Sequence, residues 1–350
     1  MLVGKTYAPI LYARSAEIKA LSALPDTTKD LIFPLIVGRP WQNAKNLSKT
    51  WENIKGALGN RRFGLDLDPF KRHSNGRQPA ASEFDALFDP ADGHKAYFDE
   101  LKNIHGAIPT LQVYPEGNIS KQIENAAQLD RGLILRIQYN ITPDPISLAK
   151  IVLRSISDIS IFVDLGWSND LLSREAWASS IISSLSEEEI ETELVICGSS
   201  FPDAFRRLAR DERRADERVI FDNLVRRHNS KVITYGDWAS TRPPRLPTPM
   251  GSIPHRIDLP NTREWICFRQ EGAETFQEIA VRAINDYAWP SDLKIWGTYQ
   301  ISATAEGVPD SIKGQTTAAA VRVNIHLHQQ AHFGSAGDFS DRDEPFTDDL

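Results

Sequence analysis

The chain has 350 residues, 41% of them hydrophobic, and its 47 Asp and Glu against 40 Lys and Arg give a formal net charge of −7. A chain with this net negative charge lacks the excess of positive charge that is typical of general nucleic-acid binding. No apolar run approaches the length of a membrane span and the N-terminus does not resemble a signal peptide, so we expect a soluble, cytoplasmic protein with no membrane contact. The two cysteines, Cys197 and Cys267, indicate neither a disulfide framework nor a zinc knuckle.

Eight apolar runs with β-branched residues alternate with stretches of helical spacing, at intervals of roughly 25 to 35 residues. This rhythm predicts an α/β fold, a (β/α)8 TIM-like barrel over residues 1–240, with an open doubly wound sheet as the alternative. Pro34, inside the second run, and the shortness of the seventh run weigh against a count of eight. The predicted strands are Tyr7–Ala13, Leu31–Val37, Phe63–Asp68, Ile108–Val113, Leu133–Gln138, Ile159–Leu165, Leu194–Gly198 and Val232–Gly236.

Two segments inside the barrel region are unusual. The long insertion over residues 69–93 predicts a lid or a partner surface, with simple disorder as the alternative. Four of its residues would bring positive charge beside Asp66 and Asp68: Lys71, Arg72, His73 and Arg77. The arginine-rich run Phe205–Arg218 also carries acidic and apolar residues at helical spacing. We interpret that run as a solvated helix face.

After the eighth strand, six prolines between residues 241 and 260 indicate an extended strap. Beyond it we predict a C-terminal α+β appendage over residues 241–333, packed on the barrel because its aromatic side chains need burial. Residues 334–350 are predicted to form a disordered acidic tail. The expected elements of the appendage are a strand pair at Arg256–Leu259 and Trp265–Arg269, a helix over Glu274–Tyr287, an apolar segment at Leu293–Ile301 and the run Thr316–Gln330.

Alternation along the strands places polar side chains together near their C-terminal ends, where chemistry sits in a barrel. Because the outer face of a strand packs under helices, we expect the polar face to point inward at the mouth. The candidate catalytic residues are Asp66, Asp68, Asp164 and Asp237. The candidate ligand-binding residues are Arg14, Arg39, Gln112, Arg136, Gln138, Ser199, Ser200 and Tyr235.

This charged mouth allows two interpretations. In the first, the charges form an internal network of ion pairs, since an unpaired charge in a dry interior is costly. In the second, Arg14 and Arg136 grip a phosphate while Asp66 and Asp68 hold a divalent metal such as Mg²⁺ or move a proton. The backbone at Ser199 and Ser200, before a following helix, would suit a phosphate.

A histidine cluster lies near the C-terminus at His326, His328 and His332. If Val321–Gln330 is a strand, the first two share a face; if it is a helix, the last two lie one turn apart. No HExxH motif accompanies them, so a polar contact between the appendage and the barrel is favoured over a metal site.

Four segments together resemble the beta protein family of phages and bacteria: YAPILYARSAE at Tyr7–Glu17, SSFP at Ser199–Pro202, YGDWAS at Tyr235–Ser240 and RVNIHL at Arg322–Leu327. The resemblance spans nearly the whole chain and implies a gene of a phage or mobile element, hence the host cytoplasm. It implies no established reaction and transfers no catalytic residue.

Two functions stay open, and whether the protein is an enzyme is undecided. The first is a barrel-mouth pocket that binds or hydrolyses a phosphorylated small molecule or nucleotide. The second is a non-catalytic scaffold that binds phage or host proteins through the 69–93 loop and the appendage.

Overall fold

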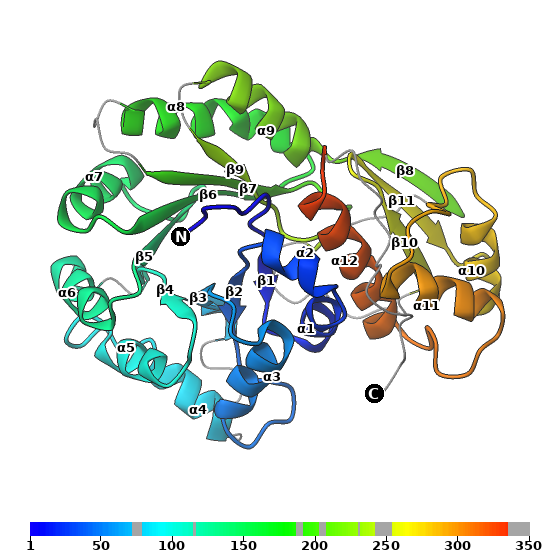
Figure 1. Cartoon of the computed structure of the whole chain (residues 1–350), viewed down its shortest axis with the longest axis horizontal. Helices are drawn as coiled ribbons and strands as arrows, with labels where there is room; N and C mark the ends of the chain where they lie inside the picture. Colours follow the sequence, from blue (N-terminus) through cyan, green and yellow to red (C-terminus); the bar gives the residue numbers. More distant parts are fainter. Residues whose placement is uncertain are drawn as a thin grey trace.

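The computed structural model describes residues 1–71, 79–114, 117–186, 192–202, 208–229, 232–241 and 254–334. It is a mixed α/β fold built on two parallel four-stranded sheets (Figure 1). The first sheet has the order β1 (Ile10–Tyr12), β2 (Leu35–Gly38), β3 (Phe63–Leu67) and β4 (Ala107–Pro109). The second has the order β5 (Leu133–Gln138), β6 (Ile159–Trp167), β7 (Glu193–Ser199) and β9 (Ile233–Tyr235).

The two sheets touch at both pairs of edges. Single parallel bridges join Tyr7 to Tyr235 and Thr110 to Ile134. The amide of Ile10 also donates to the carbonyl of Asp237 at 2.7 Å. Every predicted strand run therefore contains a strand, and each is in parallel contact with the next.

Pro34 causes no gap in the hydrogen bonding between strands. Strand β2 begins at the next residue, Leu35, and the carbonyl of Pro34 itself accepts from the amide of Gly64 at 2.9 Å.

Helices follow the strands and cover their outer faces (Figure 1). Two of the helix starts are capped by side chains: Asn118 accepts from the amide of Lys121, and Asp144 accepts from that of Ser147. The helices that accompany the two parallel sheets are α1 (Ser15–Ser22), α2 (Asp26–Leu31), α3 (Ser48–Leu58), η1 (Pro69–Lys71), α4 (Pro79–Ala86), α5 (Lys95–Lys102), α6 (Ile119–Leu129), α7 (Pro145–Ser155), η2 (Leu171–Arg174), α8 (Glu175–Ser186) and α9 (Asp216–Arg227).

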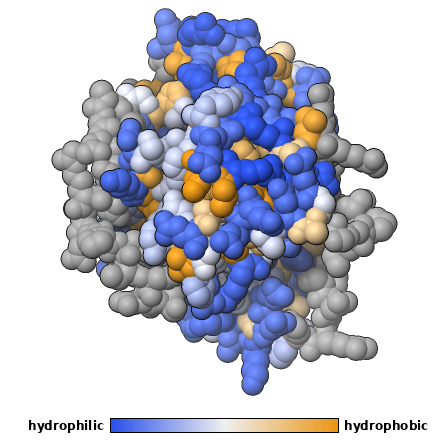
Figure 2. Space-filling view, turned by 90° about the vertical axis from the view of Figure 1, so that its right-hand side faces the viewer, coloured by the Kyte–Doolittle hydropathy of each residue, from blue (hydrophilic) through white to orange (hydrophobic). Residues whose placement is uncertain are grey.

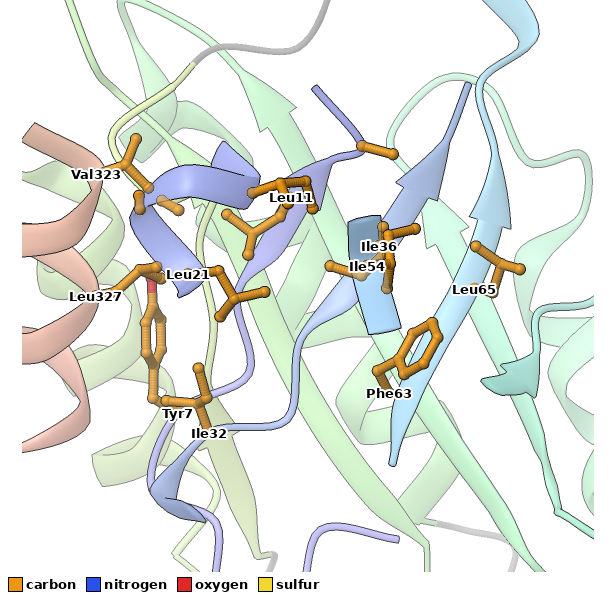
Figure 3. Close-up of a cluster of buried hydrophobic side chains, with 14 of the residues drawn as sticks. Tyr7, Leu11, Leu21, Ile32, Ile36, Ile54, Phe63, Leu65, Val323 and Leu327 are labelled. Atoms are coloured by element: carbon orange, nitrogen blue, oxygen red, sulfur yellow. The ribbon is translucent and has the colours of Figure 1, made fainter. Parts of the chain in front are cut away.

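The alternating side chains of the strands form two buried layers. Figure 3 shows part of the larger layer, in which Leu11, Ile36 and Leu65 from the strands pack with Ile54 of α3 and Leu21 of α1. The smaller layer draws side chains from both sheets and so lies between them; its members include Ile10, Tyr12, Val37, Ile108, Ile134, Phe162, Val195, Cys197 and Trp238.

The C-terminal part adds an antiparallel sheet, with β11 (Glu264–Arg269) between β10 (Arg256–Pro260) and β8 (Arg210–Arg214). Helices α10 (Phe276–Ile284), α11 (Trp296–Ala305) and α12 (Gln315–Ala331) complete it. On the face seen in Figure 2, charged and polar side chains separate small apolar groups.

The helix predicted for the arginine-rich run is wrong over most of its described part, and only its last residues, from Asp216 to Arg218, are helical. Residues Arg210–Arg214 form β8, and α9 begins at Asp216. Helical spacing of charges did not decide the conformation, because β11 offers this segment a full ladder of hydrogen bonds in an antiparallel pair. Residues 203–207 of the run lie outside the described residues.

Helix α12 packs on α1 and α2 and thereby joins the last described helix of the chain to the first. Val323 and Leu327 face Tyr7 and Leu21 in Figure 3. Polar contacts strengthen this packing, since the side-chain amide of Asn324 donates to the carbonyl of Ala20 at 3.0 Å.

The described part of the insertion over residues 69–93 contains the short helix η1 and the packed helix α4. In α4, Ala80, Ala81 and Phe84 are buried. Arg72, His73 and Arg77 lie outside the described residues, as do most of the proline-rich strap and the predicted tail from residue 335 onward.

Candidate functional site

The centre of the site is a buried arginine held between two carboxylates at the C-terminal ends of three strands. Nη1 of Arg136 lies 2.8 Å from Oδ2 of Asp66, and its Nη2 lies 2.7 Å from Oδ2 of Asp164. All three side chains are almost fully inaccessible to solvent. The alternation predicted for β3, β5 and β6 therefore brings these three residues together, as the sequence analysis expected.

Neighbouring donors satisfy the remaining oxygens of the two carboxylates. Oδ1 of Asp66 accepts from the Leu67 amide at 2.8 Å and from the Gln112 side chain at 3.2 Å. Oδ1 of Asp164 accepts from the indole of Trp238 at 3.0 Å and from the Gly166 amide at 2.8 Å.

The charge balance explains how Arg136 is kept ionised. Burial alone lowers its pKa, but the two carboxylates raise the pKa by more, so it lies above its ordinary value. This arrangement is the internal ion-pair network of the first interpretation.

A second ion pair lies beside the first. Arg39 donates through Nη2 to Oδ2 of Asp68, and its guanidinium stacks on the ring of Tyr12 with 4.3 Å between Cζ and the ring centroid. Burial, followed by the charge of Asp68, raises the pKa of the Tyr12 hydroxyl well above its usual range. No hydrogen bond between described residues involves that hydroxyl, so Tyr12 offers an available polar group in an otherwise paired region.

A cavity of about 570 Å³ opens above these pairs. Its size falls within the range of small-molecule sites. Six of the lining residues are aromatic, and Asp68, Asp164, Arg136 and Arg174 supply charge. The other lining residues are Tyr12, Val37, Pro69, Phe70, Val113, Tyr114, Gln138, Tyr139, Ile141, Gly166, Trp167 and Trp238.

Arg14 does not line this cavity. Its Nε lies 2.6 Å from both carboxylate oxygens of Glu17, and its Cζ lies 5.2 Å from the centroid of Tyr12. Because α1 begins at Ser15, Glu17 comes one turn back onto Arg14 and takes up the charge that we expected to meet a phosphate. The structure therefore does not bring Arg14 and Arg136 to one cavity as predicted, and both guanidiniums already bind carboxylates.

Tyr235 and Asp237 do not point into the cavity, and their predicted convergence with the other residues is wrong. Asp237 accepts from the hydroxyls of Tyr7 and Tyr235, and its Oδ2 lies 2.7 Å from Nε2 of His326 on α12. Burial raises the pKa of Asp237, but contacts with His326 and Tyr7 outweigh it, so the pKa lies below the usual value.

The error has a physical cause. We expected the outer face to be covered by apolar helices, whereas α12 presents His326 there. The inner face at this point is crowded instead: a Cβ added to Gly236 would lie 2.6 Å from the carbonyl oxygen of Ala8.

Ser199 and Ser200 also lie outside the cavity lining, and their predicted phosphate cradle is wrong. The hydroxyl of Ser199 donates to the carbonyl of Thr241 at 2.8 Å. The amide of Ser200 donates to Oε2 of Glu217 at 3.0 Å, so a carboxyl group of the protein occupies the position expected for an anion.

Glu217 gives a prediction for the pH dependence of stability. Burial, followed by the charge of Asp237, raises its pKa to about 7. The pKa of Glu217 is higher in the folded protein than in the unfolded chain. Its contribution to the free energy of unfolding is therefore fully present below about pH 4.5, and about 3 kcal/mol of it is lost as the pH rises from there through 7. We expect Glu217→Gln, which cannot ionise, to unfold at higher urea concentration than the wild type at about pH 8.

The advantage of Glu217→Gln should disappear near about pH 4.5, where both side chains are neutral. The exposed Glu124→Gln serves as the control and should not alter the pH profile. Equal stability of Glu217→Gln and wild type at high pH would contradict the assignment of a neutral, buried carboxyl.

In the described part of the chain, no three His, Cys, Asp or Glu side chains are grouped so that they could hold a metal ion. Asp66 and Asp68 each pair with an arginine instead. The run that carried the histidines is a helix, and ring nitrogens of His328 and His332 each lie 3.0 Å from the hydroxyl of Thr28. These polar contacts join α12 to α2.

Comparison with known proteins assigns the chain. The sequence profile of the family described as Beta protein matches residues 7–332. The chain belongs to the beta protein family. Within the family it is 26% identical to "Protein beta" of Enterobacteria phage P4 over 352 residues, which cover 97% of each chain. No solved structure matches.

The described residues of this beta-family protein include no helix that is both long and apolar enough to cross a lipid bilayer. Reasoning from its sequence missed several residues of the cavity, among them Trp167, Arg174 and Trp238. Trp238 could have been found by continuing the alternation of β9 past Asp237. Trp167 and Arg174 could not, because a register shift follows Asp164 in β6 and Arg174 belongs to the short helix η2.

Proposed function

We propose that this protein binds a small, flat organic molecule in the cavity at the C-terminal ends of its strands. The observation that carries the proposal is the cavity of about 570 Å³ with aromatic walls and a charged floor. We further propose that the two parallel sheets are the halves of one (β/α)8-type barrel, of which this cavity is the mouth. The bridges from Tyr7 to Tyr235 and from Thr110 to Ile134 support that closure.

The lining supports a planar ligand with both donors and acceptors. Aromatic walls such as Trp238 and Tyr139 bind flat rings through dispersion and stacking. The hydroxyl of Tyr12 and the side-chain amide of Gln138, neither of which is hydrogen-bonded to another described residue, can each donate or accept. A heteroaromatic ring such as a nucleobase has this combination of properties.

The ion pairs favour binding over hydrolysis. A general base needs a carboxylate that can reach the ligand with a free lone pair. Both oxygens of Asp164 accept hydrogen bonds from the protein, and Asp66 is held by Arg136 and Gln112. Asp68 is held likewise, by Arg39 and by the amide of Phe70. We therefore propose for Asp66, Asp68 and Asp164 a role in fixing the floor of the pocket, and for Gln138 a role in contacting the ligand.

The test uses the uncharged fluorescent probe N-phenyl-1-naphthylamine, whose emission rises in apolar surroundings. We expect saturable binding to the wild type and at least about tenfold weaker binding to Gln138→Trp, whose larger side chain would occupy part of the cavity and obstruct the probe. Gln128→Trp, on the exposed face of α6, is the matched control and should bind as the wild type does. Saturable binding that is unchanged in Gln138→Trp, or no binding to the wild type, would overturn the proposal.

A protein partner is the second candidate, and the rim of the cavity favours it. Phe70, Tyr114 and Ile141 are 56%, 62% and 55% exposed, which forms an apolar collar around the opening. A partner could insert one side chain into the cavity and cover this collar. In that case Ile141→Asp, which places a charge in the collar, would abolish capture of the partner.

A further inference from the structure

We propose that Arg174 is an anion-binding residue, and that the ligand of the cavity is a flat ring carrying one carboxylate or phosphate group. This inference rests on the proposed function, because it concerns the same cavity. Arg174 takes the role that the sequence had suggested for Arg14 and Arg136.

Arg174 differs from the other arginines of the site in its partners. Arg136 and Arg39 each bind a carboxylate, and so does Arg14 through Glu17. Arg174 donates through Nη1 to the backbone carbonyl of Leu165, and no carboxylate of a described residue pairs with it. Its charge is therefore available to a ligand, with further N–H groups on the guanidinium to donate.

The local backbone positions Arg174 at the cavity. The register of β6 shifts between Asp164 and Trp167, and Gly166 within this shift has a φ of +65°. A Cβ at Gly166 would lie 3.3 Å from Nη1 of Arg174, so the glycine both permits the left-handed backbone and leaves room for the guanidinium. On its other side the guanidinium stacks on Tyr139, with 4.5 Å from Cζ to the ring centroid.

This stacking fixes the guanidinium plane before any ligand arrives. Ordering a long side chain on binding is costly, and a prearranged arginine avoids that cost. Arg174 is also only partly buried, so an anion can reach it without complete loss of its water.

The distribution of charge orients the ligand. Two carboxylates flank Arg136 at the floor, which leaves the floor with a net negative charge, whereas Arg174 places a positive charge beyond the end of β6. A ligand with hydrogen-bond donors on its ring and an anionic group at the opposite end complements both regions. A nucleoside phosphate and an aromatic carboxylic acid share this chemistry.

The experiment compares three competitors with the same ring, each displacing N-phenyl-1-naphthylamine: 1-naphthalenemethanol, 1-naphthoate and 1-naphthyl phosphate. On the wild type we expect at least one anion to displace the probe at about tenfold lower concentration than the alcohol. In Arg174→Gln that advantage should disappear, while displacement by the alcohol stays unchanged. Arg154→Gln, on the exposed face of α7, is the matched control and should keep the advantage.

The outcomes separate the two proposals. If the probe binds the wild type but neither anion surpasses the alcohol, or if the advantage persists in Arg174→Gln, the inference is wrong and the proposed function stands. If the probe does not bind the wild type, the proposed function is wrong, and the inference about Arg174 is wrong with it. A stronger effect of the phosphate identifies a phosphate monoester as the natural group, and a stronger effect of the naphthoate identifies a carboxylate.

Discussion

Replacing Arg136 with methionine is expected to lower the free energy of unfolding by about 3 to 5 kcal/mol. Arg136 is 5% exposed, and its removal leaves Asp66 and Asp164 facing each other without a counterion. A buried carboxylate without a partner favours its protonated form, so the deficit should shrink when the pH is lowered toward about 4. Urea denaturation at several pH values measures both effects.

A triple variant gives the control for this prediction. Asp66→Asn, Arg136→Met and Asp164→Asn together remove all three charges, and each asparagine oxygen can still accept the bonds now made to Oδ1. We expect the triple variant to recover most of the lost stability, since replacing a whole buried ion network with neutral groups costs little. If Arg136→Met alone unfolds at the wild-type urea concentration, the three residues do not form a buried network.

Replacing Asp237 with alanine should have an effect of similar size, about 3 to 5 kcal/mol. The carboxylate accepts hydrogen bonds from Tyr7, Tyr235 and the amide of Ala239, and it contacts His326. All of these groups are buried, so the substitution leaves several polar atoms without partners. Chemical denaturation measures the loss, and hydrogen exchange should show that the amides of α12 lose protection more than those of α7.

The comparison variant is Asp222→Ala, which removes an ion pair to Arg263 on a partly exposed surface. Its expected cost is below about 1 kcal/mol, since solvent screens such pairs. Equal losses for the two variants, or unchanged protection of α12 in Asp237→Ala, would contradict the assignment of Asp237 to the contact between α12 and the strands.

Much of the architecture could be predicted because period-two alternation is local. All eight predicted runs contain strands, and the face assignment of β3, β5 and β6 placed Asp66, Arg136 and Asp164 together. The match of the family profile confirms the resemblance drawn from four short segments.

The predictions from sequence are wrong where a segment distant in the chain determines the conformation of a residue or the direction of its side chain. Asp237 turns outward because His326 arrives from 89 residues further along the chain. Arg210–Arg214 became a strand because β11 pairs with it, a contact that no local pattern encodes. The cavity walls include Arg174 because of a register shift in β6, and such shifts carry no simple sequence signal.

The packing of α12 on α1 also constrains how the molecule can be made. The contact that joins Tyr7, Asp237 and His326 links positions 230 and 89 residues apart, so it closes only after residue 331 has left the ribosome. Until then the outer faces of β1 and β9 stay open, and loop closure over such separations is slow. A chain that stops before α12 therefore leaves Tyr7 and Asp237 uncovered, where chaperones and proteases can reach them.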